Sequence, residues 1–333
     1  MEYRNLGRTG VKVSPLCLGC MMFGRKADEK LSMEIVDKAI DYGINFFDTA
    51  NAYQRGLSEE YLGKALKRNG KRDQLIIATK VHGFMNDYDP NAGGISRRHI
   101  IDQCNQSLKR LQTDYIDLYQ LHRPQSDIPI DESLRAFDDL IRAGKVRYIG
   151  TSTFAPWQIV NSIWVSKELG LNRFVSEQPP YHLLDRRIER ELIPVALQFG
   201  IALLIWSPLA GGFLTGKYKR GENKPEDSRF KESSPWADHH FTEEAFKVLD
   251  VLIEIAKEKN CTPSQLAIAW TIRREGITSS IIGPKNLEQL NDNLGALDLK
   301  LSDDDNKRLD EVSKSGRTIL SYYEADFNNY KYN

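Results

Sequence analysis

The chain of 333 residues lacks the features that mark several classes of protein. It has 46 basic and 46 acidic residues and no basic run, so it would not attract nucleic acid or an anionic membrane surface. Its longest strongly apolar strand-like run, Ile201–Trp206, is far shorter than the roughly 20 residues that span a bilayer. The first residues lack the apolar core of a signal peptide. We therefore expect a cytoplasmic protein that binds neither nucleic acid nor membrane.

Cysteine is also scarce, with four residues. Cys17 and Cys20 are spaced as C-x-x-C, a pattern found in zinc sites and redox pairs. No second pair follows, and on an extended strand residues i and i+3 face opposite sides. We interpret both as small buried hydrophobic residues and expect no metal site.

What is present is ordinary globular composition, 41% hydrophobic and 28% charged, arranged as alternating strand and helix patterns. The predicted strands are apolar on both faces, as in a parallel sheet that helices cover. They are Val13–Cys20, Asn45–Asp48, Leu75–Lys80, Tyr115–Leu121, Val146–Thr151, Arg173–Glu177, Ile201–Trp206 and Ser280–Ile282.

Helical patterns with an apolar stripe lie between these strands. They run from near Ser32 to Gly43, from Ser58 as N-cap, from Ser96 to Leu111, over Leu134–Ile141, from Pro156 to about Glu168, from about Ile188 to Gln198, and from about Leu287 to Gly295. The gap before the last strand holds a polar loop, 217–242, and two helical patterns, Glu243–Lys259 and Thr262–Arg274, one of which is extra. A last helix opens at Ser302.

Eight such units predict an α/β fold: one (β/α)8 TIM barrel. Its single domain would span residues 1–333, with a core of about 13–296 and a C-terminal helix and tail over 302–333. The barrel would carry an extra helix and a long loop between its seventh and eighth strands.

Four ionisable residues lie at or just after the ends of successive strands: Asp48, Tyr53, Lys80 and His122. In a parallel barrel these ends share one rim, where barrel enzymes keep their chemistry. A tyrosine phenol is a weak acid unless a neighbouring ammonium stabilises its phenolate, and a carboxylate can hold that ammonium in place. A histidine beside them can orient a carbonyl group or help pass a proton. Each residue alone has a structural explanation, but their joint placement favours proton transfer during carbonyl reduction.

The segments around these residues have a recognisable sequence. Asp48-Thr49-Ala50-Asn51-Ala52-Tyr53, followed by the segment 58–66, resembles the first signature of the aldo-keto reductases. Thr79-Lys80 and Leu121-His122-Arg123-Pro124 match the positions of that family's catalytic lysine and histidine. The resemblance runs from Leu6 to about Asn293. It implies an NADPH-dependent reductase of aldehydes or ketones, possibly sugar-like, in which Tyr53 is the general acid, Lys80 and Asp48 tune it and His122 orients the substrate.

The resemblance also assigns cofactor positions for NADPH/NADP+, whereas no G-x-G-x-x-G follows a strand to indicate a Rossmann fold. Ser152 and Gln178 would hold the nicotinamide carboxamide, with Thr153 standing where relatives have asparagine. Trp206 would stack on the ring, and Lys285 would contact the 2′-phosphate, which favours NADPH over NADH. The other implied cofactor positions are Gly19, Met21, Asp48, Ser207, Pro208, Leu209, Gly211, Gly212, Lys217, Gly283, Gln289, Asp292 and Asn293.

The substrate, a small carbonyl or alcohol, would be bound by loops after the strands and by the C-terminal tail. Candidates are Met22, Phe23, His82, Phe84, Arg123, the segments 86–94 and 219–242, and the tail aromatics Tyr322, Tyr323, Phe327, Tyr330 and Tyr332. Two alternatives stay open: an NADPH-binding subunit of the potassium-channel β type, and a lyase or isomerase that uses Lys80 as a Schiff base. Asp48 argues against the second, since such a lysine is usually not paired to a carboxylate.

Overall fold

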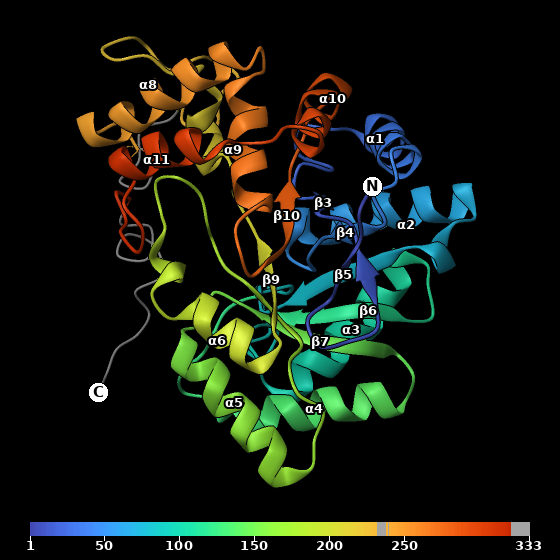
Figure 1. Ribbon diagram of the computed structural model, residues 1–333. Helices are drawn as coiled ribbons and strands as arrows, with labels where there is room; N and C mark the ends of the chain where they lie inside the picture. The colour runs from blue at the N-terminus through green and yellow to red at the C-terminus, as the bar shows by residue number, and fades with distance from the viewer. Residues whose placement is uncertain (232–237, 239, 321–333) are drawn as a thin grey trace.

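The computed structural model describes residues 1–231, 238 and 240–320 (Figure 1). Eight parallel strands close into a barrel in the order β10-β3-β4-β5-β6-β7-β8-β9, which confirms the predicted (β/α)8 fold. The strands are β3 (Leu16–Gly19), β4 (Phe46–Asp48), β5 (Ile76–Val81), β6 (Ile116–Leu121), β7 (Val146–Ser152), β8 (Ser176–Gln178), β9 (Ala202–Ile205) and β10 (Ile277–Ile282).

Helices surround the barrel (Figure 1). They are α1 (Glu29–Asp41), α2 (Leu57–Asn69), α3 (Arg97–Leu111), α4 (Ile130–Arg142), α5 (Pro156–Leu169), α6 (Leu192–Phe199), α8 (Glu243–Glu258), α9 (Pro263–Ile272), α10 (Leu287–Leu294) and α11 (Asp303–Val312). The expected extra helix between the last two strands is present, because both α8 and α9 precede β10. The helix predicted from Ser302 is α11, and Ser302 is its N-cap.

The first predicted strand is wrong in one respect. Val13 belongs to a separate hairpin, in which β1 (Arg4–Asn5) pairs antiparallel with β2 (Lys12–Val13). Pro15, which has no backbone N–H to donate, separates this hairpin from the barrel strand that begins at Leu16. The hairpin packs Leu6 and Val13 against side chains of the barrel interior, so it plugs the end at which the strands start.

Two helix starts and the region around β8 also differ from prediction. Helix α1 begins at Glu29 with Asp28 as N-cap, and Ser32 is buried within it. Helix α2 is preceded by Gly56, whose φ of 102° suits glycine, so Ser58 is not the N-cap. Strand β8 lies at Ser176–Gln178 instead of Arg173–Glu177, and the helix expected over 188–198 is a 3-10 turn, η3 (Arg187–Glu189), followed by α6.

The core consists of two layers. The inner layer lies within the barrel and includes Cys17, Phe46 and Leu118, while the outer layer lies between the strands and the helices and includes Cys20. Both cysteines are buried and unbridged; Cys17 in β3 faces the inner layer, and Cys20, just after β3, faces the outer layer. Burial of a large apolar side chain contributes about 1.5–3 kcal/mol, so this double layer holds the strand ends in fixed positions.

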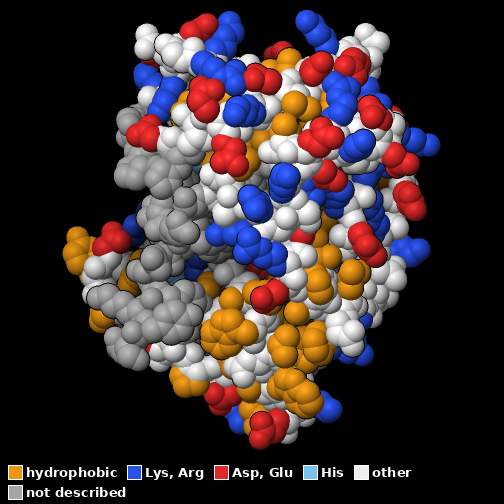
Figure 2. All heavy atoms as spheres, turned by 60° about the vertical axis from the view of Figure 1, so that its left-hand side comes forward, with side chains coloured by type: hydrophobic (Ala, Val, Ile, Leu, Met, Phe, Trp, Pro, Cys, Tyr) orange, Lys and Arg blue, Asp and Glu red, His pale blue; other side chains and the backbone are white. Residues whose placement is uncertain are grey.

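The surface mixes charges of both signs over much of the face in Figure 2, whereas hydrophobic side chains gather low on it, at the height of α5 and α6. Trp157 and Trp164 of α5 and Leu197 of α6 each keep more than half of their surface exposed. In the described part of the chain no helix has the length and apolarity needed to cross a bilayer.

Candidate active site

The four residues singled out at strand ends come together in the structure. Asp48 is the last residue of β4, Lys80 lies in β5 and His122 follows β6 directly. Tyr53 opens a short 3-10 turn, η1 (Tyr53–Gly56), after β4. Because β4, β5 and β6 are adjacent and parallel, their carboxyl ends bring these side chains to one rim of the barrel.

Lys80 is the centre of the group. Its ammonium is fully buried, forms an ion pair with Asp48, donates to the Thr49 carbonyl at 2.8 Å and lies 3.5 Å from the Tyr53 hydroxyl. Burial opposes its charge, but the Asp48 carboxylate and then Tyr53 outweigh burial and raise the pKa of Lys80 above its ordinary value. Lys80 therefore stays an ammonium beside the phenol.

Two glutamines hold the other side of the Asp48 carboxylate. The amide of Gln120 donates to its Oδ2 at 3.2 Å and that of Gln178 at 2.9 Å. Asp48 is thus fixed by three donors, and its contact with Lys80 cannot swing away without breaking them. The sequence reasoning missed Gln120, although a polar residue near the end of the otherwise apolar strand β6 was a usable signal.

His122 faces Tyr53 edge to face, with ring centroids 5.6 Å apart and planes at 80°. Burial, and then the charges of Lys80 and Arg123, lower the pKa of His122 well below its ordinary value. His82, in the next loop, has its pKa lowered to about 4, mainly by burial and then by Arg123. Both imidazoles are therefore neutral near pH 7, and a neutral imidazole can donate one hydrogen bond to a carbonyl oxygen.

The loop that carries Tyr53 is tied down on both sides. The Asn51 amide donates to the Lys80 carbonyl at 3.1 Å, and the hydroxyls of Thr49 and Ser58 lie 2.9 Å apart. Ser58 in turn donates to the Cys20 carbonyl at 2.7 Å. The loop is thereby fixed to the ends of β3 and β5, which places the phenol over Lys80.

The positions assigned to the nicotinamide lie beside this group. The Ser152 hydroxyl donates to the Gln178 carbonyl at 2.9 Å, and Thr153 has a left-handed backbone with φ 60°. The side chain of Arg123 donates to the Thr153 hydroxyl at 3.3 Å. This contact links a substrate candidate to the residue that replaces the family's asparagine.

Glu177, a buried carboxyl between Thr151 and Gln178, was also missed from the sequence. It accepts from the Thr151 hydroxyl and from the Phe154 amide, the latter at 3.1 Å. Burial raises the pKa of Glu177 to about 8 against these hydrogen bonds. Through these two hydrogen bonds the Glu177 carboxyl group holds the turn formed by Ser152–Phe154 in place.

The loop after β9 has the backbone expected for a close approach to phosphate. Ser207, Ala210, Gly211 and Gly212 all have positive φ, and the Gly211 amide donates to the Ser207 hydroxyl at 2.9 Å. A Cβ on Gly211 would lie 2.6 Å from the Phe230 ring, so the chain is tightly folded there. Trp206 pairs with Pro180 at the end of β9, at the same rim.

Two lysines from different loops pair with one carboxylate, and a third lysine lies within electrostatic range of it. Asp227 pairs with Lys285, before α10, and with Lys26, after β3, at 3.3 Å. Burial, and then the charge of Lys285, lower the pKa of Lys217. Three ammonium groups against one carboxylate leave surplus positive charge, which together with the glycine loop fits a phosphate-bearing cofactor.

The other predicted positions are less uniform. Asp292 accepts from the Thr262 hydroxyl at 2.9 Å, and the Gln289 side chain accepts from the Lys285 amide at 3.1 Å. Phe23 is buried in the outer core, whereas Phe84 is exposed. Among the described residues no side-chain hydrogen bond is formed at the predicted positions Gly19, Met21, Met22, Pro208, Leu209, Gly283 and Asn293. The tail aromatics Tyr322, Tyr323, Phe327, Tyr330 and Tyr332 lie outside the described residues.

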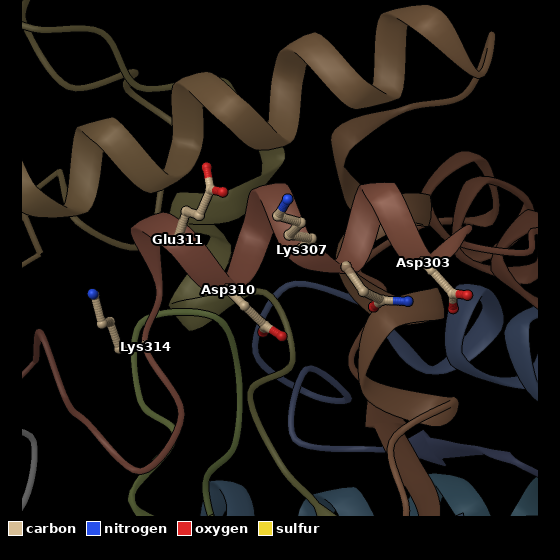
Figure 3. A pocket seen from close by; sticks show the side chains of 6 residues that line it. Asp303, Lys307, Asp310, Glu311 and Lys314 are labelled. Carbon is tan, nitrogen blue, oxygen red and sulfur yellow. The ribbon is translucent and has the colours of Figure 1, made fainter.

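An open groove along α11 is separate from this site. Figure 3 shows its lining side chains on α11 and the segment after it, with both signs of charge and none of the four rim residues. Asp310 in this groove pairs with Arg186 and Arg274, so its charge is already compensated. Within the described ranges no cluster of His, Cys, Asp and Glu has the composition of a metal site.

Comparison with known proteins gives a consistent result. A model of the aldo/keto reductase family matches residues 15–314. An uncharacterized oxidoreductase of Bacillus subtilis is 38% identical over 334 residues, covering 97% of this chain and 99% of the relative. A probable voltage-gated potassium channel subunit beta of Arabidopsis thaliana is 38% identical over 304 residues, covering 90% of this chain and 92% of the relative. A putative subunit of the same type from Schizosaccharomyces pombe is 38% identical over 322 residues, covering 94% and 93%.

Proposed function

Because the chain belongs to the aldo/keto reductase family, we propose that it reduces the carbonyl group of a small aldehyde or ketone with NADPH, reversibly. The observation that carries this proposal is the Tyr53 hydroxyl 3.5 Å from a buried ammonium that Asp48 holds. This contact gives a phenol the one neighbour that it needs to release a proton.

The proton would move at the Tyr53 hydroxyl. As the carbonyl oxygen gains negative charge, the phenol donates its proton and Lys80 stabilises the phenolate that remains. Asp48 keeps the ammonium in place. His122, neutral and facing Tyr53, donates a hydrogen bond that orients the oxygen. In the reverse direction the phenolate accepts the proton of the alcohol.

NADPH, when bound, supplies the hydride. We assign its nicotinamide end to Ser152, Gln178 and Trp206, and its phosphates to the loop after β9 with Lys217 and Lys285. Electrostatic support for this assignment comes from the surplus of positive charge around Asp227. We also propose that residues 1–333 act as one domain and that the protein works in the cytoplasm.

The experiment is turnover by the purified protein. NADPH oxidation is followed at saturating cofactor with a panel of aldehydes, ketones and sugars, and NADP+ reduction with the matching alcohols. We expect turnover of at least one carbonyl class, which Tyr53→Phe lowers by at least about a hundredfold. Tight NADPH binding with no turnover across both panels would contradict the enzymatic proposal.

The channel-subunit relatives favour a second candidate, an NADPH-binding subunit of a potassium channel. An intact rim group is compatible with both functions, so activity alone does not decide between them. Co-purification with a potassium channel's cytoplasmic region, tested with protein that binds NADPH, would favour this candidate. If the protein does not co-purify with the channel region but does turn over a carbonyl substrate, the reductase function is supported and the channel-subunit function is not.

A further inference from the structure

A second hollow lies at the opposite end of the barrel from the rim group. It is lined by Arg147 and Tyr148 at the start of β7, by Asn172 and Arg173 before β8, and by Arg8 and Thr9 from the turn between β1 and β2, together with aliphatic side chains. We call it the arginine pocket. No acidic residue lines it.

The arginines of this pocket are held by the fold. The Arg8 amide donates to the Gly200 carbonyl at 2.9 Å, and the preceding Gly7 packs so closely that a Cβ would lie 2.6 Å from the same oxygen. Arg173 donates to the Phe199 carbonyl at 2.5 Å. The guanidinium of Arg147 stacks over the ring of Tyr115, 4.6 Å from its centroid. The side chains of Arg173 and Arg147 are therefore positioned by a backbone carbonyl and by a ring, whereas the exposed Arg8 is fixed at its backbone.

These contacts do not neutralise the charge. Within residues 1–231, 238 and 240–320, Arg8, Arg147 and Arg173 form no ion pair, and the buried Nε of Arg173 has no hydrogen-bond partner. Burial, and then the charge of Arg8, lower the pKa of Arg173. Like charges thus repel across the pocket without a counter-charge.

Two carboxylates that interact with lining residues of the pocket are occupied by other partners. Asp138 accepts from the amide side chain of Asn172 at 2.8 Å and pairs with Arg142 at 2.7 Å. Asp117 interacts electrostatically with Arg147 but forms its ion pair with Arg72, at 2.8 Å. Neither carboxylate lines the pocket, so no acidic side chain of the described residues faces these arginines within it.

We propose that the arginine pocket binds a phosphate group, either inorganic phosphate or the phosphate of a small monoester. Guanidinium groups bind tetrahedral oxyanions through paired N–H donors, and the charge of three of them exceeds that of a phosphate dianion. This site goes beyond the proposed function and does not depend on it. It lies at the strand starts, whereas the cofactor residues lie at the strand ends, so the two ligands would not compete.

The test is a phosphate titration followed by 31P NMR line broadening at constant ionic strength. Wild type is compared with the double variant Arg8→Gln/Arg147→Gln, which leaves the bond of Arg173 to Phe199 intact. A control double variant, Lys67→Gln/Lys109→Gln, removes two exposed charges elsewhere that form no ion pair with the described residues. Glycerol phosphate replaces inorganic phosphate in a second arm, which identifies the source of the group. Each titration is repeated with NADPH present, so that phosphate binding at the cofactor loops is blocked.

We expect the arginine double variant to bind phosphate at least about tenfold more weakly than wild type, since each charge-assisted hydrogen bond is worth that much or more. The control variant should bind like wild type, and the NADPH Kd should stay the same in all three proteins. Equal phosphate binding by wild type and the arginine variant, or no binding by wild type, would overturn the proposal. Failure of NADPH to bind would count against the proposed function only, because the difference between wild type and the arginine variant is also measured in the titrations without NADPH.

Discussion

Tyr53 is the residue whose single oxygen atom the proposed chemistry depends on. In Tyr53→Phe the ring and its contact with His122 remain, while the proton donor beside Lys80 is lost. We expect kcat to fall by roughly 10²–10⁴, the usual worth of general acid catalysis, with the NADPH Kd nearly unchanged. Steady-state kinetics and a fluorescence titration measure the two quantities. Tyr61→Phe on α2 is the control, and a Tyr53→Phe enzyme that kept more than about a tenth of kcat would exclude Tyr53 as the acid.

Lys285 should discriminate between the two nicotinamide cofactors. Its ammonium is held by Asp227, an exposed partner, and such exposed ion pairs stabilise little and exchange readily. Lys285→Ala should weaken NADPH binding by about ten- to a hundredfold and leave NADH binding nearly unchanged. Asp227→Asn is the matched variant, and it should bind NADPH no more weakly than wild type because it removes a competing anion. Equal losses for both cofactors in Lys285→Ala would show that this residue does not contact the 2′-phosphate.

Glu177 should make the folding stability depend on pH. Its pKa is about 8 in the folded protein and near its ordinary value when unfolded, so between these values the unfolded chain releases a proton that the folded one keeps. The contribution of Glu177 to the free energy of unfolding is greatest below its pKa in the unfolded chain. It falls as the pH rises toward 8, by up to about 1.4 kcal/mol per pH unit. Glu177→Gln should flatten this slope in urea unfolding from pH 5 to 8. The exposed Glu168→Gln should keep it, and an identical slope in Glu177→Gln would show that Glu177 ionises normally.

Some site residues could be predicted from the sequence because strand ends are visible in it. Asp48, Lys80 and His122 each interrupt or follow an apolar run, and parallel strands bring such positions together. Glu177 could not be assigned a role in the same way, because its effect comes from depth of burial and from hydrogen bonds that only the folded loop makes. The pairing of Asp227 with Lys285 joins two polar loops, whose relative placement has no periodic signal.

At the scale of elements, the apolar periodicity predicts that a helix is present more reliably than it predicts the residue at which the helix begins. Ser58 has the chemistry of an N-cap but is buried inside α2, since its hydroxyl bonds to Cys20 and Gly56 makes the turn. Tertiary contacts overrode the local preference there. The arginine pocket is a similar case, because its cations come from a hairpin turn and two strand starts that look like ordinary polar residues one at a time.

Helices α2 and α3 pack so closely that one methyl group should separate them. A Cβ on Gly63 would lie 2.7 Å from the Leu111 carbonyl carbon, which is backbone and cannot move aside alone. Glycine to alanine within a helix usually stabilises by about 1 kcal/mol, but this clash should destabilise Gly63→Ala by about 1–3 kcal/mol. Urea unfolding measures the sign. Gly10→Ala, which meets nothing within 4 Å, is the control, and a stabilised Gly63→Ala would contradict the close packing of the two helices.

At the scale of the whole molecule, the barrel closes between a strand from near the start of the chain and one from near its end. Leu16 of β3 pairs with Ser280 of β10, and β10 also pairs with β9. During synthesis, β3 and β9 therefore leave the ribosome as sheet edges long before their shared neighbour exists. Open edges of this kind recruit other chains, and a pairing so distant in sequence forms slowly. The synthesis of β10 thus sets the time during which a newly made chain is exposed to aggregation. The need for chaperones should depend on the delay before β10 leaves the ribosome and not on the stability of the finished barrel.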